Sequence, residues 1–142
     1  ASVVRRLVER GVRYKALVVG AGPCRKMLAA LPGTTCVGWK SGRDLAMCYA
    51  SSDVFLFPSA VETFGNVTLE AAASGLPLVA EAGCSGHLVE DGVNGHAVPA
   101  GDGDAFYRAT LGLAEDARRR AEFSARSRQF ALGLEDEGVV RQ

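Results

Sequence analysis

The sequence carries no excess of charge of either sign. Sixteen lysine and arginine residues balance sixteen aspartate and glutamate residues, so the formal net charge is zero at pH 7. Proteins that bind nucleic acid or an anionic membrane mainly by electrostatic attraction need a strongly basic surface. The balance of charge therefore gives no support to either partner, and we expect no binding to nucleic acid.

Long apolar runs are also missing. One of the longest, residues 54–58, is far shorter than the roughly 20 residues that a membrane-spanning helix requires. The first nine residues include Arg5, Arg6 and Glu9, where a signal peptide needs apolar residues, so no export signal is visible. The sequence predicts a cytoplasmic protein, and a peripheral position on the inner face of the membrane stays open.

The cysteines lack a metal-binding pattern. The four cysteines include no C-x-x-C pair, and no pair of histidines lies near them. Cys36 and Cys48 lie within apolar segments, where a free thiol packs as a small hydrophobic group. We therefore expect reduced structural cysteines, a cytoplasmic location and no metal site.

What the sequence does contain is an alternation of strand-like and helix-like segments in one domain of 142 residues. Buried strands are expected at residues 14–19, 35–37, 53–57, 76–80 and 95–98. Helices are expected at residues 2–10, 24–31, 44–50, 65–74, 105–114 and 116–130, with a glycine-rich turn at 83–86 followed by one or two helical turns.

This alternation predicts an α/β fold with a doubly wound, Rossmann-like parallel sheet. Continuous apolar runs are typical of strands that are covered on both faces, and alternating helices supply the crossovers between parallel strands. Ligands of such sheets lie outside the carboxyl ends of the strands. The loops after Val19, Val37, Phe57 and Ala80 are therefore the expected binding edge.

The loop after Phe57 holds the residues with the most specific chemistry. It contains Glu62 and leads through Gly65 into a helix whose start can accept a phosphate on its unpaired N–H groups. Glu70 lies less than two turns into that helix, and its side chain leans back toward the helix start. Two carboxylates beside one helix start suit a ligand in which a diphosphate joins a sugar to a ribose.

The surrounding residues resemble a known family. Residues 58–79, with Glu62 and Glu70 separated by seven residues, are similar to the Glu-x7-Glu signature of the group 1 glycosyltransferases. These are retaining enzymes of the GT-B type, and the resemblance is to their C-terminal, donor-binding domain. Further segments that resemble this domain, in the expected order, are residues 18–23, 36–39, 45–58 and 91–102.

The resemblance implies a role for each site residue. Glu62 would be the catalytic residue, in contact with hydroxyls of the transferred sugar, and Glu70 would bind the ribose. Backbone N–H groups of Phe64, Gly65 and Asn66, with Val67 near them, would meet the sugar or the distal phosphate. The nucleobase would lie against Gly38, Trp39 and Lys40, and the donor cleft would be lined by Gly20 and Gly22.

The activity implied is transfer of a hexosyl group, with retention, from a UDP- or GDP-sugar to an unknown acceptor. The resemblance implies no cofactor and no obligatory metal, because positive groups and N–H dipoles stabilise the departing diphosphate. A lipid or a glycan acceptor is compatible with it. The alternative is a non-catalytic module that binds a nucleotide-sugar.

The sequence departs from the family pattern at its start. The family's domain opens with a strand that ends in a glycine-arginine turn, followed by a lysine; both cations hold the diphosphate. Arg5, Arg6, Arg10 and Arg13 do not match these two cations. We therefore expect a domain that lacks its first strand and its N-terminal acceptor domain, and that is inactive alone. An exposed sheet edge left by that strand could support a homo-oligomer.

Four other patterns have two readings. Gly20-Ala-Gly22 could open a dinucleotide fingerprint, but a third glycine and a following acid are missing. Asp102-Gly-Asp104 could bind a metal, although an aspartate before a helix more often caps it. Residues 118–120, three arginines, could touch a membrane or form a solvated helix face. His87 stands where the family has a glutamate, and it could donate a proton or contact a phosphate, or be a surface histidine of the turn.

Overall fold

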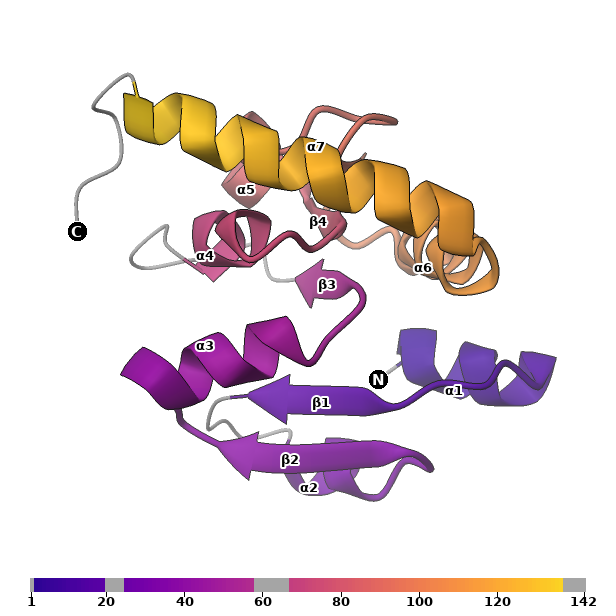
Figure 1. The fold of residues 1–142 in the computed structure, drawn as a ribbon. Helices are drawn as coiled ribbons and strands as arrows, with labels where there is room; N and C mark the ends of the chain where they lie inside the picture. The colour runs from indigo at the N-terminus through magenta and orange to yellow at the C-terminus, as the bar shows by residue number, and fades with distance from the viewer. Residues whose placement is uncertain (1, 20–24, 58–66, 137–142) are drawn as a thin grey trace.

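The computed structural model describes residues 2–19, 25–57 and 67–136, and its strands and helices alternate as expected (Figure 1). The strands are β1 (Ala16–Val19), β2 (Thr34–Gly38), β3 (Phe55–Phe57), β4 (Leu78–Glu81) and β5 (Gly95–Val98). Every strand pair is parallel. The α/β fold class with parallel strands is confirmed.

The strands of the described residues form two sheets, one of β1 and β2 and the other in the order β3-β4-β5. β1 and β3 each pair along one edge and are not paired with each other. In the doubly wound order 3-2-1-4-5-6, a strand that precedes the first helix lies between these two edges. The division into two sheets falls where the resemblance expects that strand.

The helices follow the predicted positions closely. They are α1 (Ser2–Arg10), α2 (Arg25–Ala29), α3 (Gly42–Ala50), α4 (Val67–Ala73), α5 (Ala82–Ser85), α6 (Gly103–Glu115) and α7 (Ala117–Asp136), with the 3-10 turn η1 (Gly86–Leu88). None of them, within the described ranges, is long and apolar enough to cross a membrane.

Two segments differ from the prediction by more than small shifts of their ends. The expected glycine-rich turn at 83–86 is helical: α5 covers its first three residues and η1 starts at the fourth. The side chain of Glu81 accepts a hydrogen bond from the Gly83 N–H at 2.7 Å, which caps the start of α5. α7 runs six residues past the predicted end at 130.

The end of α4 shows why a glycine follows it. Gly75 has a φ of +80°, the left-handed conformation that favours glycine. Its N–H bonds to the carbonyl of Ala72, and the N–H of Leu76 bonds to that of Ala71. This pair of bonds is the Schellman ending, and the predicted C′ position of Gly75 is confirmed.

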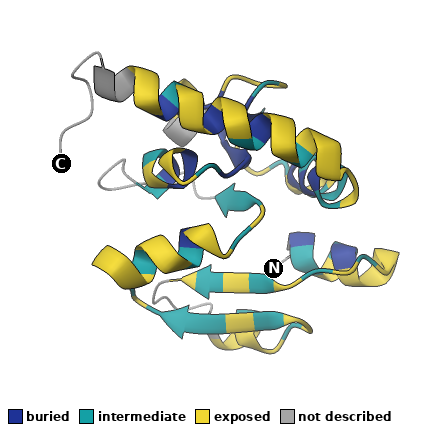
Figure 2. Ribbon diagram, viewed as in Figure 1, coloured by how far each residue is buried: buried dark blue, intermediate teal, exposed yellow. Residues whose placement is uncertain are grey.

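The hydrophobic core lies on both faces of β4 (Figure 2). Leu78 and Ala80 face a cluster that includes residues of α4, whereas Val79 faces a second cluster with α1, α6 and β5. Successive side chains of a strand point to opposite faces, so one buried strand serves both clusters. β4 is therefore the strand about which this part of the protein is packed.

Asp102 was expected either to bind a metal or to cap a helix, and the structure shows a cap. Its side chain accepts a hydrogen bond from Ala105 N–H at 3.0 Å, as the N-cap of α6. We expect Asp102→Ala to lower the free energy of unfolding by about 1 kcal/mol in urea titrations, because the cap is lost. Asp102→Asn keeps a capping oxygen and serves as the control. Equal destabilisation by both substitutions would contradict the capping role.

Candidate functional site

The carboxyl ends of the strands lie at one side of the protein. In Figure 1 the arrowheads of β1, β2 and β3 point the same way, and α4 lies beyond the end of β3. Phe57, the last residue of β3, is in register with Ala80 of β4. The segment that joins β3 to α4 therefore leaves the sheet at the edge where a ligand is expected.

Six predicted site residues lie outside the described residues. Gly20 and Gly22 belong to the segment between β1 and α2; Glu62, Phe64, Gly65 and Asn66 belong to the segment between β3 and α4. Their assigned roles stay predictions. The described residues of the predicted site are Gly38, Trp39, Lys40, Val67 and Glu70.

Glu70 lies in the first turn of α4, on an exposed part of the helix. Thr68, Ala71 and Ala72 are buried, so α4 packs on the core through the face that these residues share. A carboxylate in a first turn is favoured by the helix dipole. Since helical side chains lean toward the helix start, Glu70 can reach a ligand held there.

Val67 is the first described residue of α4, and the predicted start at 65 lies outside the described residues. Its carbonyl accepts a hydrogen bond from the hydroxyl of Tyr49 in α3 at 3.3 Å. Tyr49 is itself buried against the core. This contact ties the start of α4 to α3, and so fixes the position of the helix end that would receive the phosphate.

Trp39 directly follows β2 at its carboxyl end, and 73% of its surface is exposed. It is preceded by Gly38, whose φ of +76° places it in the left-handed region as the strand ends. Packing in the core is excluded as the role of this side chain, and its flat face is open to a planar group such as a nucleobase. Lys40, next along the chain, is half-buried.

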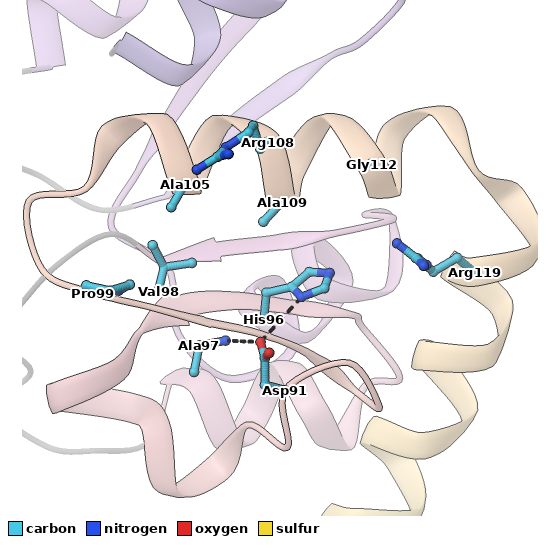
Figure 3. Close-up of a pocket in the computed structure, with 10 residues that line it drawn as sticks. All are labelled: Asp91, His96, Ala97, Val98, Pro99, Ala105, Arg108, Ala109, Gly112 and Arg119. Atoms are coloured by element: carbon cyan, nitrogen blue, oxygen red, sulfur yellow. Dashed lines mark hydrogen bonds and ion pairs between the residues drawn. The ribbon is translucent and has the colours of Figure 1, made fainter.

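A shallow groove of about 380 Å³ lies along β5 and α6 (Figure 3). Several of its polar side chains have partners within the protein. His96 Nδ1 lies 3.4 Å from the Asp91 carboxylate, and Arg108 pairs with Asp104 at 3.0 Å. Arg119, also in the lining, lies over the ring of Phe123 at 5.9 Å, and His96 packs edge-on against the same ring.

Asp102, Asp104 and Arg120, the last of the three arginines, have structural partners among the described residues. Asp104 lies 2.9 Å from Arg6, besides its pair with Arg108. Arg120 donates to the carbonyls of Leu113 and Ala114, at 2.7 and 2.8 Å, and so caps the end of α6. Across the described part of the chain, no group of three histidine, cysteine, aspartate or glutamate residues could hold a metal ion.

Sequence reasoning missed Glu81. It is the last residue of β4, it is only 4% exposed, and it stands at the same edge of the sheet. The sequence does contain a pattern that points to Glu81. It is an acid that directly follows the apolar residues Leu78, Val79 and Ala80, at the carboxyl end of a predicted strand.

Comparison with known proteins identifies the family of this chain. Residues 1–116 match the sequence model of the family described as Glycosyl transferases group 1. A GDP-mannose-dependent alpha-mannosyltransferase of Mycobacterium tuberculosis is 34% identical over 119 residues, which are 82% of this chain and 31% of the relative. The chain thus spans about a third of that protein's length.

Two solved structures share the fold. The C-terminal domain of LpcC, a glycosyl transferase group 1 family protein of Francisella tularensis, matches 99% of this chain and 77% of its own, with a TM-score of 0.77 and 19% identity. HepE of Anabaena, in complex with UDP-glucose, matches 93% of this chain and 40% of its own, with a TM-score of 0.76 and 23% identity. The order of motifs, the fold and the family match lead to one assignment: this chain belongs to the group 1 glycosyltransferases.

Proposed function

We propose that this chain binds the nucleotide-sugar donor of a hexosyltransferase, and that the full-length protein transfers the sugar with retention. The observation that carries the proposal is the acid in the first turn of α4, beyond the carboxyl end of β3, in a chain of this family. Relatives support the class of donor: one is named as GDP-mannose-dependent, and another was solved with UDP-glucose.

The donor would lie across the carboxyl ends of both sheets. Glu70 would accept hydrogen bonds from the ribose hydroxyls, and the base would stack on the exposed face of Trp39. Glu62 would contact the transferred sugar. The start of α4, tied to Tyr49, would receive the phosphate on its backbone N–H groups.

No cofactor and no obligatory metal enter the proposed reaction. Positive groups and N–H dipoles would stabilise the departing diphosphate, with the cations supplied from outside residues 1–142. An acceptor domain ahead of this chain would provide the second substrate, a lipid or a glycan. We place the protein in the cytoplasm or on the inner face of the membrane, which is where soluble nucleotide-sugars are available.

A donor screen on the full-length protein tests the proposal. We expect release of nucleoside diphosphate from a UDP- or a GDP-hexose, unchanged within about twofold when EDTA is added, because no metal takes part. NMR of the product should show the anomeric configuration of the donor. Binding of a nucleotide-sugar without release would instead favour the non-catalytic module, and an inverted product would reject retention.

A further inference from the structure

Glu81 is the only buried carboxylate in the described part of the chain. It ends β4, the strand whose preceding residues Leu78, Val79 and Ala80 are all fully buried. Burying a carboxylate is costly unless hydrogen bonds compensate the lost hydration. A carboxylate kept at such a position is therefore expected to have a specific partner.

One partner is the backbone of the turn that follows β4. Glu81 Oε1 accepts a hydrogen bond from the N–H of Gly83 at 2.7 Å, the length typical of a charge-assisted bond. A Cβ atom at position 83 would lie 3.0 Å from Oε1 and 3.5 Å from Oε2. The carboxylate thus lies directly against the Gly83 backbone, so a side chain at position 83 would press on it.

The location of this contact gives it a functional meaning. Ala80 is level with Phe57, the end of β3, and Glu81 is level with Val98, the end of β5. The turn formed by α5 and η1 therefore begins at the carboxyl edge of the sheet. It follows β4, whose neighbour β3 is the strand before α4. Ligands of parallel sheets lie outside this edge.

We propose that Glu81 is a positioning residue of the donor site. Its buried carboxylate holds the backbone of residues 82–88 in place, so that this turn forms one wall of the nucleotide-sugar site. This role rests on the proposed function, and it adds a residue that the Glu-x7-Glu pattern does not contain.

Two substitutions at Glu81 in the full-length protein separate positioning from general stability. Glu81→Ala removes the acceptor; we expect the donor KM to rise about tenfold, with kcat and the acceptor KM within about threefold of wild type. Glu81→Gln keeps an acceptor oxygen of the same reach, and should restore the donor KM to within about threefold. A fall in kcat and in thermal stability at unchanged donor KM would overturn the role.

A double-mutant cycle tests the contact itself. Gly83→Ala places a methyl group against the carboxylate, so it should raise the donor KM about fivefold in the otherwise wild-type protein. In the Glu81→Ala background the same substitution should have an effect below twofold, because the atom that it meets is gone. Independent, multiplicative effects would contradict a direct contact.

Hydrogen exchange distinguishes failure of this role from failure of the proposed function. Amide protection of the peptide that contains Gly83 should fall in Glu81→Ala and persist in Glu81→Gln. Unchanged protection in Glu81→Ala would reject the inference alone. Lost protection, in a protein whose wild type turns over no nucleotide-sugar, would reject the proposed function and the donor role with it.

Discussion

Glu62→Ala and Glu70→Ala, each made in the full-length protein, are expected to lower kcat/KM for the nucleotide-sugar by about 10- to 150-fold. This range corresponds to the loss of one charge-assisted hydrogen bond, which is worth about 1.5–3 kcal/mol. Glu70→Ala should act mainly on the donor KM, because ribose binding is the same in the ground state and the transition state. Glu62→Ala should act mainly on kcat, since its partner is the transferred sugar.

Steady-state kinetics with a matched control decide this prediction. Glu115, at the exposed end of α6, is an acid of the same size on a different part of the surface. Glu115→Ala should leave both constants within about twofold of wild type. Wild-type rates in both site variants would show that the two acids do not bind the donor, and the assigned roles would be wrong.

Gly95→Ala is expected to lower the free energy of unfolding by about 3 kcal/mol, the upper part of the range for overpacked sites. A Cβ atom at Gly95 would lie 1.9 Å from the carbonyl oxygen of Leu78 and less than 3 Å from two further backbone atoms of that residue. These atoms belong to the backbone of Leu78, which cannot move aside by a rotamer change as the end of a flexible side chain can. β5 would have to move away from β4, the strand that serves both core clusters.

Urea-induced unfolding, followed by circular dichroism, measures this effect. Gly112→Ala is the control, because nothing lies within 4 Å of a Cβ atom at that position of α6. It should raise stability by about 0.5–1 kcal/mol, since alanine favours a helix interior over glycine. A loss of less than about 1 kcal/mol in Gly95→Ala would show that the two strands have room to separate.

Local signals in the sequence predicted most of the helix ends. Asp102 before α6 and Gly75 after α4 act within a few residues of themselves, through a side-chain cap and a left-handed φ. The start of α7 was placed within one residue, and the Asp116 carboxylate accepts from the Arg119 N–H at 3.0 Å there. Such contacts depend on short stretches of chain, so a sequence pattern can reveal them.

Residues 83–86 show the limit of this kind of reasoning. Two glycines in four residues favour a turn, yet the chain forms α5 and η1 there. The decisive contact comes from Glu81, a side chain that the pattern assigns only to the end of a strand. Its burial depends on β3 and β5 on either side of β4, which no short window of sequence contains.

Local periodicity and motifs were enough to predict the alternation of strands and helices, the parallel α/β class and the family. The roles of Glu62 and Glu70 follow from a motif and stay predictions. Only the packed structure shows that Trp39 is exposed and that the side chain of Glu81 is buried. These features depend on which segments meet across the sheet. Burial and edge pairing are properties of the packed protein, and they arise only when distant parts of the chain come together.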